Sequence, residues 1–389
     1  MPSKDVILFS TADWDTPYWT NKQHTAKHLA KMGRRVLYIE TVGLRPPKLY
    51  SGRDLGRLWR RLKLGLKGPR KVENGIWVLA PLVIPIKHHW SLIRWLNKQL
   101  IAFFIQQFMK KNLFSEPIIW TYHPFILGAI QNINHGKVVF HCVDDLSAVP
   151  GVDIQAYKAE EKKLLERCDV VFTTSEKLTE QCEKYNDNVH FLPNVVDYEH
   201  FSSARSVDVL PADLSGIPEP RIGYIGVLSD FKVDFDLIYA VATEKKEWHW
   251  VLIGEQREGQ SSDKVSRLGL LPNVHFLGYK PYEKLPQYLS GMAVATLPTL
   301  INEYTASMFP MKYFEYLAAG VPVVSTPLDF TKQYIKGMRV ANNRESFVLA
   351  IDSQILRGRL NGGESLNYVG GNTWRARLKI MVNMLNEAH

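Results

Sequence analysis

The chain has 389 residues, of which 46% are hydrophobic and 22% charged, and a formal net charge of +9 at pH 7. This composition is typical of a globular protein with a sizeable core, and the length predicts two or three domains. We expect neither a transmembrane helix, because no run of about 18 apolar residues occurs, nor a secretory signal, because MPSKDVILFSTADW lacks a long apolar segment.

The first half alternates apolar strand patterns with amphipathic helix patterns. Strands are predicted at 5–10, 34–40, 76–81, 118–123, 138–143, 169–175 and 188–194. Helices are predicted at 20–33, 90–111, 125–133, 154–168 and 176–185.

After a stretch with three prolines and no strong period, 202–221, the alternation starts again. Strands are predicted at 221–229, 248–254, 273–279, 294–299 and 321–326. Helices are predicted at 234–245, 282–289, 311–320, 344–357 and 373–386.

Such alternation is typical of an α/β protein with doubly wound parallel sheets. We predict two Rossmann-like domains, residues 1–205 and 217–372, joined by a linker at 206–216. Open sheets of this kind bind ligands beyond the carboxyl ends of their strands, so a site in a cleft between the domains is expected.

The positive charge is concentrated between Arg45 and Lys71, where ten basic residues accompany one acid, Asp54. Leucines and a tryptophan interleave with them at spacings of three and four, a pattern that suits an anionic membrane surface. The candidate membrane contacts are Arg57, Trp59, Arg60, Arg61 and Lys63. A solvated helix face and nucleic-acid binding are the alternatives, and we expect no nucleic-acid partner. The segment 90–112 is similar, but ordinary helix packing explains it equally well.

Three cysteines, Cys142, Cys168 and Cys182, form no C-x-x-C pair. We therefore expect buried free thiols in a reducing cytoplasm and no metal or disulfide role. No G-x-G-x-x-G or G-x-x-x-x-G-K-[ST] occurs either, which argues against a dinucleotide oxidoreductase and a P-loop protein.

Two patterns in the second half point to a phosphate-bearing ligand. Gly223 and Gly226 lie in or just after a strand, where glycine lets a backbone N–H approach a phosphate, although tight packing explains them as well. A helix is predicted to begin near Pro310, with Lys312 in its first turn and Glu315 on the same face. The lysine could hold a diphosphate and the glutamate two ribose hydroxyls; a surface ion pair is the alternative.

The second half resembles the nucleotide-sugar-binding domain of GT-B glycosyltransferases of group 1. The resemblance runs through PNVVDYEHF, GYIGVLSDFKVDFDLI, VLIGEQ, PNVHFLGYKPYEKLPQYLSGMAVATLPT and PMKYFEYLAAGVPVV. In the first half it includes ADWDTPYWTNKQHTAKHLAKMGRRVLYIE and FHCVDDLS. The sequence looks closest to bacterial surface-polysaccharide enzymes of the teichuronic-acid and xanthan glucuronosyltransferase type. The resemblance implies a C-terminal helix, 373–389, that packs back on the first domain.

The resemblance also implies roles for individual residues. Lys312 and Pro310 would lie at the diphosphate, Glu315 at the ribose, Gly226 at the phosphate-side turn and Tyr279 beside the base. A Gly-Arg pair of the family is here Gly226-Val227, so Lys232 would replace the missing cation. The retaining members carry Glu-x7-Glu; here Ser307 stands eight positions before Glu315, and Glu303 four residues earlier still.

Asp144 and Asp145 directly follow the predicted strand 138–143. A carboxylate at this strand end could act as the general base of an inverting transfer, and in the resembling xanthan enzyme an aspartate at the matching position does so. Helix capping is the alternative, which we favour for Asp145. The acceptor-side candidates are Asp13, Trp14, Asn21 and His24, with capping an alternative for Asn21.

Together these features predict a glycosyltransferase that moves a sugar from a nucleotide diphosphate donor, UDP-linked, to a lipid-linked oligosaccharide in bacterial surface polysaccharide synthesis. We expect no cofactor and no metal, and a peripheral position on the cytoplasmic face of the cell membrane. A nucleotide-sugar 2-epimerase of the same fold and a non-catalytic basic membrane- or nucleic-acid-binding protein are the alternatives.

Overall fold

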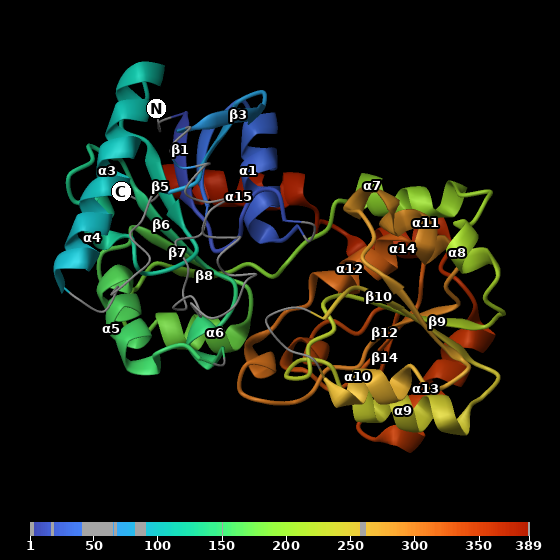
Figure 1. Cartoon of the computed structure of the whole chain (residues 1–389). Coiled ribbons are helices and arrows are strands. Elements are labelled where there is room, and N and C mark those ends of the chain that lie inside the picture. Colours follow the sequence, from blue (N-terminus) through green and yellow to red (C-terminus); the bar gives the residue numbers. More distant parts are fainter. Residues whose placement is uncertain are drawn as a thin grey trace. The chain divides into compact units, whose positions relative to one another are not determined.

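The computed structural model describes residues 4–16, 19–40, 65, 68–81, 91–149, 151–256 and 262–387 (Figure 1). The chain divides into two compact units, one formed by Met1–Pro193 with Leu378–His389 and the other by Asn194–Arg377. The predicted membrane contacts lie outside the described residues: Arg57, Trp59, Arg60, Arg61 and Lys63.

The described part of the first unit forms an eight-stranded sheet with the order β3-β4-β2-β1-β5-β6-β7-β8. Its strands are β1 (Asp5–Phe9), β2 (Arg35–Ile39), β3 (Arg70–Glu73), β4 (Ile76–Leu79), β5 (Ile118–Thr121), β6 (Val138–Cys142), β7 (Val170–Thr173) and β8 (Val189–Phe191). Every neighbouring pair is parallel except β3 and β4. Strands β1, β5, β6 and β7 are buried along their whole length, as continuous apolar runs predict.

Helices cover both faces of this sheet. They are α1 (Asn21–Lys31), α3 (Ser91–Asn112), α4 (Leu127–Ile130), α5 (Ile154–Leu165), α6 (Glu176–Cys182) and, from the C-terminus, α15 (Trp374–Glu387). Along β1 the side chains alternate: Ile7 and Phe9 pack in a cluster with α3 and α4, whereas Val6 and Leu8 pack in a cluster with α1 and α15. The C-terminal residues thus complete one face of a sheet that begins at the N-terminus.

The second unit has a parallel sheet with the order β11-β10-β9-β12-β13-β14 in its described residues. The strands are β9 (Arg221–Ile225), β10 (His249–Ile253), β11 (Val274–Gly278), β12 (Val294–Leu297), β13 (Val323–Ser325) and β14 (Met338–Val340). In both units the strand order reverses in the middle, between β1 and β5 and between β9 and β12. The α/β class with two Rossmann-like domains is confirmed.

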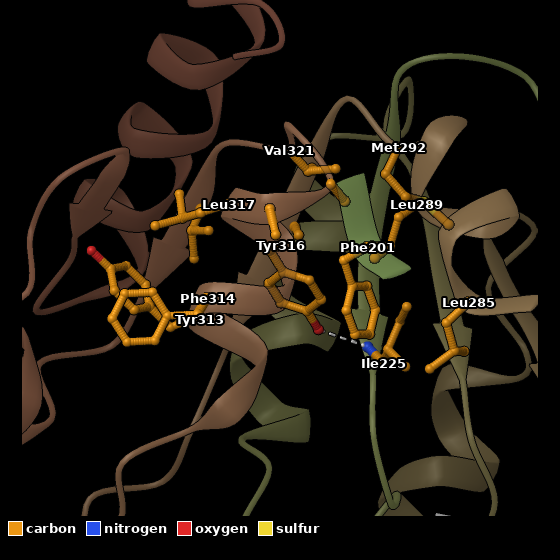
Figure 2. Close-up of a cluster of buried hydrophobic side chains, with 14 of the residues drawn as sticks. Phe201, Ile225, Leu285, Leu289, Met292, Tyr313, Phe314, Tyr316, Leu317 and Val321 are labelled. Carbon is orange, nitrogen blue, oxygen red and sulfur yellow. Dashed lines mark hydrogen bonds between the residues drawn. The ribbon is translucent and has the colours of Figure 1, made fainter. Parts of the chain in front are cut away.

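Two helical layers cover the second sheet. One contains α7 (Tyr198–Ser202), α8 (Ala212–Ser215), α11 (Leu285–Ser290), α12 (Met311–Ala318) and α14 (Gly362–Val369). The other contains α9 (Phe235–Glu244), α10 (Asp263–Leu268) and α13 (Arg344–Arg357). Figure 2 shows the first of these cores, where Tyr316 of α12 lies among Phe201, Leu289 and Ile225.

The expected linker differs from the structure. Residues 206–216 are not an extended connection, because α7, a 3-10 turn (Ser203–Ser206) and α8 precede β9 and pack on the second unit. Phe201 and Leu214 are completely buried there, so the boundary between the units falls after Pro193 and not near residue 205. Prolines and the lack of a period concealed these short helices from sequence reasoning. None of the helices within the described ranges is long and apolar enough to cross a membrane.

Candidate functional site

Three glycines stand in a row at the carboxyl ends of neighbouring strands in the second unit. The Gly226 N–H donates to the Ile253 carbonyl at 2.9 Å, and the Gly254 N–H donates to the Gly278 carbonyl at 2.9 Å. Gly254 has φ +146°, and a Cβ there would overlap the carbonyl oxygen of Gly226. The close approach of two backbone segments therefore requires glycine at 254, and the three glycines place no Cβ of their own at this sheet edge, which lets backbone N–H groups approach a phosphate.

Close packing accounts for both glycines of the pair Gly223 and Gly226. A Cβ at Gly223 would lie 3.0 Å from the side chain of Met292 inside the core, and a Cβ at Gly226 would lie 2.7 Å from the Tyr224 hydroxyl. Gly226 differs from Gly223 in that it also lies at the strand end.

Helix α12 begins at the same edge, because it connects the carboxyl end of β12 to β13. Lys312 and Glu315 form an ion pair with Nζ and Oε2 2.6 Å apart, and the glutamate side chain is 4% exposed against 27% for the lysine. The first-turn N–H groups and the lysine together favour an anion, while the buried carboxylate accepts hydrogen bonds. The ion pair of the alternative is therefore present, but Glu315 is buried, so the pair does not lie on the surface.

Several hydrogen bonds hold the C-terminal half of helix α12 in place. The Tyr316 hydroxyl accepts the Ile225 N–H at 3.0 Å, which ties the helix to the last residue of β9 (Figure 2). At the C-terminal end Arg205 donates to the Ala318 carbonyl at 2.6 Å and Arg359 to the Ala319 carbonyl at 2.7 Å. Burial, and then the charge of Arg205, lowers the pKa of Arg359 to about 10, so it stays charged at neutral pH. Cations at a helix C-terminus stabilise the helix dipole.

The loops after β9 and β12 hold each other. The Leu300 N–H donates to the Lys232 carbonyl at 2.9 Å, and Asn302 Nδ2 donates to the Phe231 carbonyl at 2.8 Å. The ammonium of Lys232 lies 5.2 Å from the ring centre of Tyr304. Lys232, predicted as a second phosphate cation, is thus half-buried on this loop pair and packs on aromatic rings.

A second group of polar residues surrounds Glu315. Burial raises the pKa of the Tyr282 hydroxyl, and the charges of Glu315 and then Asp197 raise it further. The ring of His200 stacks on Tyr282 at 4.4 Å, and a His200 ring nitrogen lies 2.9 Å from the Tyr282 carbonyl oxygen. Asn194 donates to the Phe309 carbonyl, just before α12, at 2.5 Å. The segment 194–201 therefore supports the first turn of α12.

The other predicted donor-side residues occupy different environments. Tyr279 is half-buried and follows Gly278 at the end of β11, and Pro310 stands at the N-cap of α12. Glu303 is exposed on the loop before α12. Ser307 is completely buried, and its hydroxyl donates to the Tyr304 carbonyl at 2.9 Å, so this position is occupied by a loop-stabilising residue.

In the first unit the two adjacent aspartates have different partners. Asp145 is buried and caps a 3-10 turn (Leu146–Ala148): its Oδ1 accepts the Ser147 N–H at 3.1 Å, and Lys158 Nζ lies 3.6 Å away. Asp144 has a side chain 30% exposed, with Oδ2 3.8 Å from the Nζ of Lys22 in the first turn of α1. Of the two carboxylates, Asp144 is therefore the more accessible one.

The segment after β1 is held by hydrogen bonds. The Trp14 N–H donates to Glu40 Oε1 at 2.9 Å, and Gln23 Nε2 donates to the Asp13 carbonyl at 3.0 Å. Burial raises the pKa of Glu40, while the Trp14 N–H opposes the rise. Tyr38 donates to the Ala12 carbonyl at 2.9 Å. These bonds fix the backbone that presents Asp13 at the carboxyl edge of the sheet.

Of the four acceptor-side candidates, the structure buries three. Trp14 packs against Tyr38 with ring centres 5.1 Å apart, and His24 packs against Trp19 at 5.5 Å. Asn21 is buried too, and Thr20 rather than Asn21 stands at the N-cap of α1. Asp13 is half-exposed.

Sequence reasoning missed four residues at these edges: Gly254, Tyr316, Glu40 and His123. His123 follows β5, between the ends of β1 and β6; it is buried, and its Nδ1 has no hydrogen-bond partner among the described residues. Burial lowers the pKa of His123 to about 4. Its place at the end of the stretch IIWTYH, like that of Glu40 at the end of RRVLYIE, was the available signal, since the carboxyl ends of parallel strands gather at one edge.

No group of three or more His, Cys, Asp or Glu side chains that could hold a metal ion occurs within the described ranges. The three cysteines are free and buried, as expected: Cys142, Cys168 and Cys182.

Part of the second unit matches the model of a known protein family. Residues 219–355 match the family model described as Glycosyl transferases group 1. A Bacillus subtilis (strain 168) protein named as a teichuronic acid biosynthesis glycosyltransferase, TuaH, is 30% identical over 184 residues, which cover 46% of this chain and 45% of the relative. The match thus spans about half the length of that relative.

Solved structures resemble the chain over nearly its whole length. Sucrose-phosphate synthase from Thermosynechococcus elongatus has a TM-score of 0.73 at 16% identity, covering 98% of both chains. Anabaena HepE in complex with UDP and glucose has a TM-score of 0.65 at 15% identity, covering 99% of both. At such identities the likeness concerns the fold.

Proposed function

We propose that this chain, which has the GT-B fold and carries a group 1 glycosyltransferase domain in its second half, transfers a sugar from a UDP-sugar to a lipid-linked oligosaccharide of a bacterial surface polysaccharide. The observation that carries the proposal is the sheet edge at Gly226 and Gly254 together with the Lys312–Glu315 pair of α12. The relative named for teichuronic acid biosynthesis and the neighbour that binds UDP and glucose support the same assignment.

The donor is proposed to bind by its charged half. The diphosphate would lie against the backbone at Gly226 and Gly254 and at the first turn of α12, where Lys312 supplies a positive charge. Glu315 would accept the two ribose hydroxyls, and Lys312 would turn from Glu315 toward the phosphates. Tyr279, Lys232 and Glu303 line the loops that would surround the rest of the donor. A lysine and a helix N-terminus can neutralise a leaving diphosphate, so the proposed reaction uses no metal.

The chemical step is proposed to invert the anomeric carbon. The acceptor hydroxyl oxygen attacks that carbon, Asp144 takes the hydroxyl proton, and UDP leaves with its new charge near Lys312. Asp144 is partly exposed beside Lys22, whereas Asp145 is committed to capping. Ser307 supports inversion, because the position that holds a carboxylate in retaining relatives has only a buried hydroxyl here.

The acceptor is proposed to be membrane-bound, and the protein to work on the cytoplasmic face of the membrane. The support comes from the sequence between Arg45 and Lys71, whose ten basic residues and interleaved leucines suit anionic lipid. Asp13 is the acceptor-side residue best placed for a sugar hydroxyl, being half-exposed after β1.

A thermal-shift panel tests the donor site. UDP, GDP, ADP and dTDP are added to wild type, Lys312→Ala and the control Lys336→Ala, which removes an exposed lysine of the same unit. We expect UDP to raise the melting temperature of wild type and the control but not of Lys312→Ala, because a ligand stabilises only the state that binds it. Equal shifts in all three would contradict the assignment. Turnover of UDP-sugar without any acceptor would point to the epimerase instead.

A further inference from the structure

We propose that the outer face of α3, defined by Leu92, Trp95, Phe103 and Lys110, docks on an anionic phospholipid bilayer. The three apolar side chains are 60%, 55% and 52% exposed. At 3.6 residues per turn, all four residues fall within a sector of about 80° and extend over about 27 Å. Figure 1 shows α3 at the periphery of the first unit.

The opposite face of α3 already serves the core. Ile101, Ile105, Phe108 and Met109 are buried against the sheet with residues of β1 and β2. A helix on the surface of a globular domain normally has a polar outer face, whereas on the outer face of α3 the apolar Leu92, Trp95 and Phe103 alternate with Gln99, Gln106 and Lys110. Three large apolar side chains exposed in one stripe, with polar side chains between them, indicate an interaction surface.

The charges of α3 favour anionic lipid over a protein partner. The 22-residue helix SLIRWLNKQLIAFFIQQFMKKN contains four basic residues and no acid. Its exposed C-terminal end carries Lys110 and Lys111. Tryptophan and phenylalanine settle at the boundary between headgroups and acyl chains, and lysines beside them attract phosphate headgroups. One helix thus combines both chemistries that a bilayer surface offers.

The position of α3 in the fold links this face to the reaction, and this part rests on the proposed function. Because α3 connects the parallel strands β4 and β5, its N-terminal end lies at the carboxyl edge of the sheet. Leu92 and Trp95 are therefore at the same end of the first unit as Asp13 and Asp144. A bilayer held there presents a lipid-linked saccharide to that edge.

Co-sedimentation of the full chain with vesicles measures the docking. We expect wild type to bind phosphatidylglycerol/phosphatidylcholine vesicles. Trp95→Ala/Phe103→Ala should lower the partition coefficient about tenfold or more, because each substitution removes most of an apolar side chain that would be buried in the bilayer. The matched control is Leu349→Ala/Leu356→Ala, which removes two leucines 68% and 88% exposed on α13. Lys110→Gln/Lys111→Gln should weaken binding to anionic vesicles but not to pure phosphatidylcholine, with Lys246→Gln/Lys336→Gln as its control.

A fluorescent label tests whether α3 contacts the bilayer directly. The three native cysteines are buried, so Phe103→Cys can be labelled selectively with an environment-sensitive fluorophore. Its emission should shift to the blue on anionic vesicles, and that of labelled Leu356→Cys should not.

Three outcomes would overturn the proposal. The first is an unchanged partition coefficient for Trp95→Ala/Phe103→Ala. The second is an equal dye response at positions 103 and 356. The third is a dimer of the wild type without lipid that Trp95→Ala/Phe103→Ala converts to monomers, which would make a second copy of the chain the occupant of this face. The UDP-induced thermal shift separates the two proposals. If an α3 variant loses vesicle binding but keeps the UDP-induced shift, the result bears on the docking face alone. If UDP does not shift the melting temperature of wild type, the proposed donor site is contradicted and the docking face is not.

Discussion

In both sheets the strand order reverses in the middle, but the carboxyl edges of the two sheets differ in chemistry. At the edge of the second unit Gly226, Gly254 and Gly278 leave bare backbone, and charge comes from the first turn of α12. The edge of the first unit carries side chains: Asp144, Glu40 and His123, each directly or nearly directly after a strand. A backbone edge suits an anion such as a diphosphate, whereas an edge of carboxylates and imidazole suits hydroxyl groups that must be oriented and deprotonated. Two sheets of similar topology can therefore serve different tasks, one binding the donor and the other activating the acceptor.

The largest expected effect tests the chemistry of the first edge. Asp144→Asn should lower the rate of sugar transfer by about 10²–10⁴-fold, because the amide cannot take the acceptor proton. The UDP-induced thermal shift should stay, since the proposed donor site lies in the second unit. A radiolabelled-donor transfer assay checks the rate. A variant with near wild-type turnover would remove Asp144 from the mechanism and break the comparison.

The second prediction tests the bare backbone. Gly254→Ala should lower the free energy of unfolding by about 1–3 kcal/mol, because φ +146° is strained for any side chain and the Cβ meets Gly226. UDP affinity should fall about tenfold or more as the edge distorts. The control is Gly371→Ala, where a Cβ meets nothing within 4 Å. Denaturant unfolding and UDP titration measure both effects, and equal behaviour of the two variants would contradict the role of Gly254.

A third prediction concerns the neutral imidazole of the first edge. Burial lowers the pKa of His123 from 6.5 to about 4. The unfolded chain binds a proton here below pH 6.5 and the folded chain only below about 4, so stability falls as the pH falls through this window. By pH 5 the loss from this group is about 2 kcal/mol. The unfolding free energy of His123→Gln should therefore depend less on pH between 7 and 5. Parallel pH profiles of variant and wild type would refute the burial argument.

The smallest expected effect separates the two adjacent aspartates. Asp145→Ala removes the cap of the 3-10 turn and should cost about 1 kcal/mol, while Asp144→Ala should leave stability within about 0.5 kcal/mol. Thermal melts of the two variants side by side measure the difference. The reverse order would exchange their assignments.

The sequence was sufficient for the α/β class, because the strands at β1, β6 and β10 are continuous apolar runs between helix patterns. It also placed Gly226 at a strand end and Lys312 and Glu315 near the start of a helix, as in the structure, because these positions follow from local spacing. It could not reveal that Gly254 touches Gly226, since that contact joins residues 28 positions apart through strand pairing. Nor could it show that Trp14 and His24 are buried, because burial depends on Trp19 and Tyr38 packing around them.

The C-terminal helix α15 has a consequence for how the protein is made. Leu378, Met381, Val382 and Leu385 belong to the cluster that covers one face of the sheet containing β1. A ribosome delivers these residues after the whole second unit. The strands of the first unit are translated first, but its core cannot be completed until the residues from Leu378 to Leu385 have left the ribosome, so its folding finishes only after the second unit has been made. Nascent chains stalled before residue 378 should keep that sheet face open to chaperones, whereas the second unit, contiguous from Asn194 to Arg377, can fold as it emerges.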